Sequence, residues 1–302
     1  MNSDKRTAST PSAARRDVSK KVILTGDDFG LAPPVNEAII DANRHGTLTT
    51  ASLMIGARFA KEAVESARQC SFLKVGLHLV LVEGNPVLPP ARIPDLVDAS
   101  GAFPAHPVSA GFRFFFHPRI RAQLEAEIRA QLEAFLRTGL ALDHVNAHNH
   151  MHLHPTVLRL LLKVGRDYGL KAVRWPNEPP MRSWRVSKQS LASRCASWLF
   201  LSPWRALMKR RLRLAGVSHN DFMFGNADSG AMTLERVLGF LRNLPDGVTE
   251  LYFHPATRRC AEIDRTMPLY RHEDEYRALT SQALREALEA ERIRRISFSE
   301  IG

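Results

Sequence analysis

The chain has few cysteines and lacks any long apolar run. Its 302 residues include only Cys70, Cys195 and Cys260, an odd number without Cys-x-x-Cys spacing. Neither a disulfide framework nor a cysteine zinc site is indicated, and such thiols are typical of a reducing compartment. No stretch approaches the ~18 consecutive apolar residues of a spanning helix. We therefore expect a cytoplasmic protein.

Acidic residues are fewer than basic ones. The 42 Lys and Arg residues exceed the 31 Asp and Glu residues, which gives a formal net charge of +11 and favours anionic partners. Residues 1–20 are rich in Ser, Thr, Ala, Lys and Arg but lack the apolar segment of a secretory signal. This composition predicts a disordered leader at 1–20. Residues 21–302 then form one domain of ordinary globular composition.

Acidic residues are absent from residues 181–213, within a predicted helical insert at 181–219. This segment holds nine basic residues interleaved with tryptophan and leucine. Such a pattern is typical of a helix lying in a membrane interface, so we predict peripheral contact of 181–213 with the inner membrane. A solvated helical excursion packed on the domain is the alternative. Nucleic-acid binding is not expected, because no nucleic-acid motif accompanies the charge. A homo-oligomer stays open.

Strand-like and helix-like segments alternate along the chain, which predicts right-handed βαβ units and a parallel sheet. The fold class expected is α/β, a distorted (β/α) barrel with parallel strands, and an open doubly wound sheet is the alternative. Residues 83–118 form a long connection. The predicted strands are Lys21–Gly26, Leu48–Ile55, Leu73–Val82, Leu142–Ala147, Lys171–Trp175, Asp221–Gly225, Val248–His254 and a closing strand at Arg295–Phe298.

Polar residues fall where these strands end, which is where barrel active sites are built. They are Asp27, Asp28, His78, His148, Arg174 and His254. Two adjacent acids after an apolar strand would repel each other unless a metal or a shared proton relieved them; the alternative is a helix-capping turn. His78, alone in an apolar strand, is compatible with a hydrogen-bonded core residue as well as with a ligand.

Histidines alternate in the segment NAHNHMHLHP, at positions 148, 150, 152 and 154. Alternation at a strand end would place two or more imidazoles on one face, and imidazole is a common metal ligand. The pattern does not say which histidine binds. One carboxylate and two imidazoles from three strand ends match a catalytic metal site with an open position for water. The second carboxylate is then a candidate general base, and His254 a candidate general acid.

Four motifs in order resemble the YdjC-like carbohydrate deacetylase family: TGDDFGLAPPVNEAI, GLHLVL, DHVNAHNHMH and YFHPA. The resemblance implies Asp28, His78 and His148 as metal ligands, Asp27 as the base and His254 as the acid. His150 and His152 match the rest of the third motif. One departure is Thr25-Gly26, where the family commonly has Asn-Ala, which puts local hydrogen bonding in doubt. We assign substrate binding to Arg174, His150, His152 and Glu37.

Further stretches, among them ASLMIGARFAKEAVESAR and IPDLVDASGAFP, resemble the hopanoid-biosynthesis-associated subgroup. This resemblance implies a glycolipid substrate, an N-acetylglucosaminyl hopanoid, cleaved to the free amine and acetate. Two histidines and a carboxylate favour one Zn²⁺ ion over Mg²⁺, which prefers oxygen ligands. The alternatives are a deacetylase of soluble chitooligosaccharides, an amidohydrolase or phosphoesterase barrel, and a basic lipid-binding protein without activity.

Overall fold

The computed structural model describes residues 20–301. The predicted leader therefore lies, apart from Lys20, outside the described residues. Seven strands form one parallel sheet in the order β4-β3-β2-β1-β6-β5, and β7 pairs with β1 beside the start of that strand. The strands are β1 (Lys21–Phe29), β2 (Thr50–Leu53), β3 (Lys74–Leu79), β4 (Leu142–Ala147), β5 (Phe222–Phe224), β6 (Val248–Phe253) and β7 (Arg294–Arg295).

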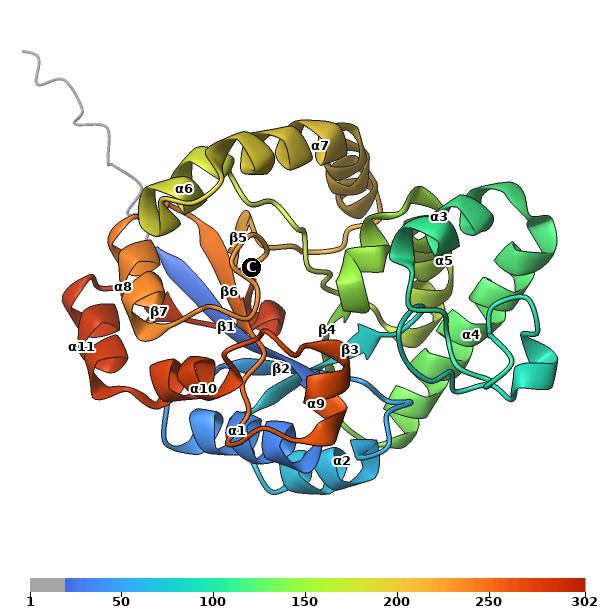
Figure 1. The fold of residues 1–302 in the computed structure, drawn as a ribbon, viewed down its shortest axis with the longest axis horizontal. Coiled ribbons are helices and arrows are strands. Elements are labelled where there is room, and N and C mark those ends of the chain that lie inside the picture. Colours follow the sequence, from blue (N-terminus) through green and yellow to red (C-terminus); the bar gives the residue numbers. More distant parts are fainter. Residues whose placement is uncertain (1–19, 302) are drawn as a thin grey trace, which may run out of the picture.

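The sheet curls, and helices surround it (Figure 1). The α-helices outside the 83–118 and 181–219 segments are α1 (Pro33–Arg44), α2 (Ala60–Arg68), α4 (Pro118–Arg137), α5 (Pro155–Gly165), α8 (Leu234–Arg242), α9 (Ala261–Thr266), α10 (His272–Thr280) and α11 (Gln282–Ala290). Their buried faces and the strands share one large hydrophobic core. The predicted distorted (β/α) barrel is confirmed, since β1 to β4 lie side by side in chain order in a curled parallel sheet with the helices around it.

The predicted strand Lys171–Trp175 is wrong as a full strand. Only single bridges form there, from Val173 to β4 and from Ala172 to Ser218. The Asn220 side chain binds both the N–H and the carbonyl of Trp175 in place of a neighbouring strand. Pro176 follows and has no N–H to donate. This irregular segment fills the arc between β4 and β5.

The long connection at 83–118 carries structure of its own: the 3₁₀ turn η1 (Pro90–Arg92) and helix α3 (Pro107–Phe116). Residues 180–214 form α6 (Pro180–Ser187) and α7 (Leu191–Leu214), which cross the top of the molecule in Figure 1. Pro203 interrupts the α7 hydrogen bonds, and the Ser202 hydroxyl donates to the freed carbonyl of Leu199. Within residues 20–301 no helix combines the length and apolar character needed to cross a bilayer.

Candidate functional site

Asp27 and Asp28 occupy the end of β1, where its pairing with β2 becomes irregular. The register shifts between Gly26 and Phe29, and Asp28 has a left-handed φ of 61°. In a regular strand, neighbouring side chains point to opposite faces. The irregularity instead brings both carboxylates to the same end of the barrel, where each contacts groups from β3, β4 or the segment after β4.

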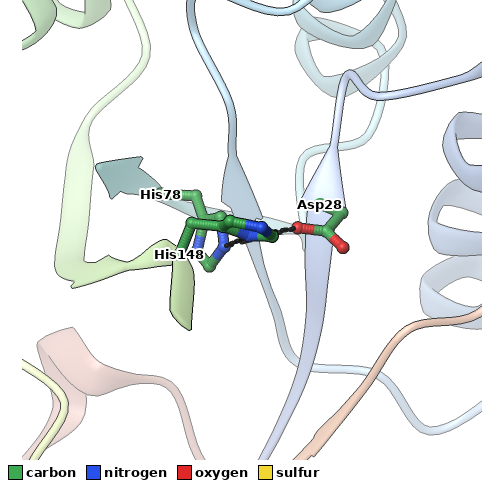
Figure 2. A group of neighbouring side chains, drawn as sticks. All are labelled: Asp28, His78 and His148. Atoms are coloured by element: carbon green, nitrogen blue, oxygen red, sulfur yellow. Dashed lines mark hydrogen bonds and ion pairs between the residues drawn. The ribbon is translucent and has the colours of Figure 1, made fainter. Parts of the chain in front are cut away.

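Asp28, His78 and His148 converge from β1, β3 and the start of the 3₁₀ segment η2 (His148–Leu153), as Figure 2 shows. The Asp28 Oδ1 atom lies 3.3 Å from His78 Nε2 and 3.4 Å from His148 Nδ1. The two imidazole nitrogens are 3.3 Å apart. The three side chains predicted as metal ligands are thus brought together, each with one donor atom facing the same point.

The surroundings of this cluster favour a bound cation. Asp27, Asp28 and Glu250 are all at most 2% exposed. The buried guanidinium of Arg174 pairs with Asp27 and Glu250 and leaves Asp28 without a fixed cation, so these carboxylates outnumber the arginine. Neither Asp28 oxygen accepts a well-formed hydrogen bond from the described residues. Burial opposes ionisation of Asp28, but contacts with His148 and His78 hold the pKa of Asp28 well below its usual range.

His148 responds to the same imbalance. Burial works against its protonation, but Asp28 and Glu83 raise the pKa of His148 to about 10. The carboxylates around His148 therefore favour positive charge at this position. A divalent cation would displace the proton on His148, as metals do when they bind ionisable ligands. The residues present therefore fit a divalent metal ion.

Asn146 orients the residues around the cluster. Its Oδ1 accepts from His78 Nδ1 at 2.7 Å, which leaves the lone pair of Nε2 facing the cluster. Its Nδ2 donates to Asp27 Oδ1 at 3.1 Å and to Ser52 Oγ at 2.8 Å. A second partner that fixes the tautomer of a ligating histidine is common around metals. Asn146 therefore ties a candidate ligand to the candidate base.

Asp27 is held in place by a buried ion pair with Arg174. Arg174 donates to both of its oxygens, at 2.6 and 3.0 Å, and also binds Glu250. Burial opposes ionisation of Asp27, but the Arg174 guanidinium outweighs it and holds the pKa of Asp27 well below its usual range. Arg174 is 0% exposed. The structure therefore places this predicted substrate-binding residue beneath the site, where it holds Asp27.

His254 directly follows β6 and lies beside Tyr252 and Tyr270, with ring centroids 5.6 and 5.1 Å away. The Glu275 carboxylate accepts from its backbone N–H, while its Nδ1 has no partner among the described residues. Burial lowers the pKa of His254 to about 4. The imidazole is therefore neutral at neutral pH and has a free nitrogen.

The other histidines of this segment, His150, His152 and His154, lie outside the cluster. His150 and His152 are in η2, where left-handed dihedral angles at Asn149 and His150 break the predicted strand-like alternation, and their rings pack edge to face, 5.8 Å apart. His150 Nε2 contacts the Tyr252 hydroxyl, His152 donates to the carbonyl of Arg174 in the core, and His154 caps α5. Only His148 joins the cluster.

Glu37 lies on the exposed outer part of α1. Its carboxylate accepts from Arg258 and Thr257, and Arg258 lowers the pKa of Glu37. Glu37, predicted to bind substrate, therefore forms an ion pair with Arg258 at the surface.

Asn146 was not among the predicted site residues, although the sequence carries a signal for it. His144, Asn146 and His148 alternate with apolar residues along β4 and its end, so the polar face of that strand runs backwards from His148. Ser52, also missed, sits between Asn146 and His144. At the Thr25-Gly26 departure, the Thr25 hydroxyl donates to Glu250.

A model of the family described as YdjC-like protein matches residues 21–290. A carbohydrate deacetylase of Brevibacillus brevis is 30% identical, over 93% of this chain and 100% of its own length. Another, of Thermoanaerobacter pseudethanolicus, is 25% identical over 78% of this chain and 81% of its own. The crystal structure of an Enterococcus faecalis protein provisionally assigned to cellobiose-phosphate cleavage superposes with a TM-score of 0.72 at 26% identity, covering 94% of this chain and 99% of that one. The chain belongs to the YdjC-like protein family.

Proposed function

We propose that this protein is a metal-dependent hydrolase that removes the acetyl group from an N-acetylated sugar. The convergence of Asp28, His78 and His148 beside the ionised Asp27 carries the proposal. The relatives named carbohydrate deacetylases support the substrate class. A divalent cation at these three residues would polarise the acetyl carbonyl and acidify the attacking water.

The protein groups supply the proton transfers. Asp27 is ionised and accepts a proton as water adds to the acetyl carbon. The Arg174 guanidinium holds the pKa of Asp27 well below its usual range, so the carboxylate is ionised before that step. His254 is neutral in the resting site, so it must gain a proton before it can donate one to the leaving nitrogen. The proton taken by Asp27 balances this step, and the products are acetate and the free amine.

We infer that Zn²⁺ is the metal. Two imidazoles and one carboxylate are a zinc donor set, and their three donor atoms lie together at the site. Mg²⁺ prefers oxygen ligands.

The finer substrate proposal is the N-acetylglucosaminyl group of a hopanoid glycolipid. The stretches that resemble the hopanoid-associated subgroup support it, and soluble chitooligosaccharides are the alternative. Acetate release from both substrates by the zinc-loaded enzyme distinguishes them. Activity on chitooligosaccharides alone would remove the glycolipid but keep the deacetylase. Release of phosphate in place of acetate would instead indicate a phosphoesterase.

Asp27→Asn tests the assigned base. The variant should keep one bound metal per chain, since Asp27 is not in the donor set, and lose activity about 10²–10⁴-fold. Metal content and acetate release are measured on the same preparations. Full activity in Asp27→Asn would remove Asp27 as the base, while loss of both metal and activity would make it a ligand.

We also propose that α3 and α7 contact an anionic membrane. Phe112 and Phe116 on α3 and Phe200 on α7 are 63%, 71% and 76% exposed. The acid-free segment 181–213, which includes α7 up to Arg213, carries nine basic residues, each worth about 1 kcal/mol near an anionic surface. Exposed aromatics beside basic residues suit an interfacial helix.

Co-sedimentation with vesicles containing phosphatidylglycerol tests this contact. The charge-reversal variant changes the exposed Arg185, Arg210 and Arg213 to Glu. It spares Arg194 and Arg205, which are buried and bind Asp228 and the carbonyl of Trp198. Wild type should pellet with these vesicles and the variant should not. Equal absence of binding in both would contradict the proposal.

A further inference from the structure

A cavity of about 740 Å³ lies between α3, η2 and the α6–α7 helices. We call it the α3–α7 cavity. Asn149 and His150, which directly follow the candidate ligand His148, form part of its wall, whereas Asp28, His78 and His148 themselves do not line it. Cavities of about 300–1,000 Å³ accommodate ligands larger than a single sugar ring.

The outer part of the α3–α7 cavity is apolar. Phe112 and Phe115 line it from α3, and Trp198, Phe200 and Trp204 line it from α7. The Phe115 and Trp204 rings approach across the two helices, with centroids 6.0 Å apart. Covering exposed aromatic surface of this kind with an apolar group is favourable in free energy.

The inner part presents a buried acid, Glu178, which is 8% exposed. Its Oε2 accepts from the backbone N–H groups of Asn226 and Ala227, at 2.9 and 3.1 Å. Its Oε1 is buried without a hydrogen-bond donor in residues 20–301. The nearest cation, Arg194 Nη1, is 3.6 Å away and donates to Asp228 at 2.9 Å.

His150 supplies a second unused polar atom to the same wall. Its Nε2 contacts the Tyr252 hydroxyl at 3.3 Å, and its Nδ1 is buried without a partner among the residues described. Buried polar groups of native proteins are normally hydrogen-bonded. A cavity with two such atoms at its inner end and aromatic rings at its outer end is complementary to a molecule with hydroxyl groups at one end and an apolar group at the other.

We propose that the α3–α7 cavity binds an amphipathic glycoside, with Glu178 Oε1 accepting a hydrogen bond from a sugar hydroxyl and the apolar aglycone lying between α3 and α7. The identification of this ligand as substrate rests on the proposed deacetylase function, whereas the binding itself does not. Glu178 is then a specificity residue, since a ligand without that hydroxyl leaves a buried acceptor unpaired.

Tryptophan fluorescence tests the site directly, because Trp198 and Trp204 line it. Zinc-loaded protein is titrated with octyl β-D-glucopyranoside below its micelle concentration, and with methyl β-D-glucopyranoside as the short-chain control. The probes carry no acetamide, so the titration is independent of deacetylation. We expect saturable quenching by the octyl glycoside and at least tenfold weaker binding of the methyl glycoside. Equal responses to the two probes would overturn the apolar part of the site.

Glu178→Gln tests the polar end. The Gln carbonyl can still accept from Asn226 and Ala227, which places an NH₂ donor where Oε1 was. Burial raises the pKa of Glu178 to about 7, so the titrations are run above pH 8, where the acid is ionised. Loss of a hydrogen bond to a charged group then weakens binding about 10–100-fold, and Glu235→Gln on α8 is the matched control. Phe112→Ser, at an exposed position that should not affect folding, must weaken the octyl probe alone. Unchanged affinity in both Glu178→Gln and Phe112→Ser would refute the site, whereas normal probe binding without acetate release would refute only the proposed function.

Discussion

Replacing Asn146 by leucine should separate metal binding from general stability. Leucine is close to asparagine in size but can neither accept from His78 nor donate to Asp27 and Ser52. His78 then loses the acceptor that keeps its Nε2 lone pair facing the cluster. Loss of such a partner typically costs 10–100-fold in metal affinity, or about 1.4–2.7 kcal/mol.

The same change removes three buried hydrogen bonds, which contribute about 1 kcal/mol each. Asn220 offers a matched control, because it is also fully buried and makes three bonds, to the N–H and carbonyl of Trp175 and to the carbonyl of Phe222. Asn220→Leu should lose similar stability in urea unfolding but keep its zinc affinity.

Zinc affinity is measured by competition with a chromophoric chelator at constant pH. Wild-type affinity in Asn146→Leu would refute the orienting role of Asn146. An equal loss of affinity in Asn220→Leu would attribute the effect to general loosening of the fold. Asn146→Asp adds a further comparison, since its carboxylate still accepts from His78 but repels Asp27. It should bind zinc more tightly than Asn146→Leu and still lose activity.

Two other predictions concern the histidines and the buried acids. His148→Ala should lower the zinc stoichiometry, and an unchanged stoichiometry would point to another ligand. His152→Ala removes the donor to the carbonyl of Arg174, so it should lower the melting temperature but keep the zinc. Burial raises the pKa of Glu275 to about 7, so the folded state holds the Glu275 proton more tightly than the unfolded state does. The stabilisation of the folded state from this proton is complete below about pH 4.5 and is lost as the pH rises towards 7. The free energy of unfolding should therefore fall across that window by about 3 kcal/mol from this group. Urea unfolding at several pH values should show a smaller fall in Glu275→Gln than in the wild type. The same pH dependence of stability in both proteins would contradict the raised pKa of Glu275.

Local patterns in the sequence were sufficient for much of the framework. The predicted strand Leu142–Ala147 has the same bounds as β4. A period-two pattern and the polar residues that follow it are both local signals, so they could be read from the sequence. The strand at Lys171–Trp175 failed because Asn220, 45 residues later, replaces the expected ladder with side-chain hydrogen bonds. No local sequence pattern predicts a hydrogen-bond partner so distant in the chain.

The candidate site divides in the same way. Asp28, His78 and His148 stand out because each is a polar residue at the end of an apolar strand. The histidines that follow were misread because left-handed dihedral angles at Asn149 and His150 interrupt the alternation. Glu178 gave no signal in the sequence, since its burial depends on backbone N–H groups at Asn226 and Ala227.

The left-handed backbone at Asp28 restricts which amino acids can serve as a ligand there. Asp and Asn tolerate a φ near 61°, whereas most other side chains, Glu and Cys among them, adopt it at a cost of about 1–2 kcal/mol. Glutamate and cysteine also bind zinc, yet at position 28 either would have to overcome this cost and would displace the donor atom from its neighbours. Asparagine keeps the backbone and loses the charge. A redesign of this donor set therefore has to begin with the dihedral angle of residue 28, before the chemistry of its side chain.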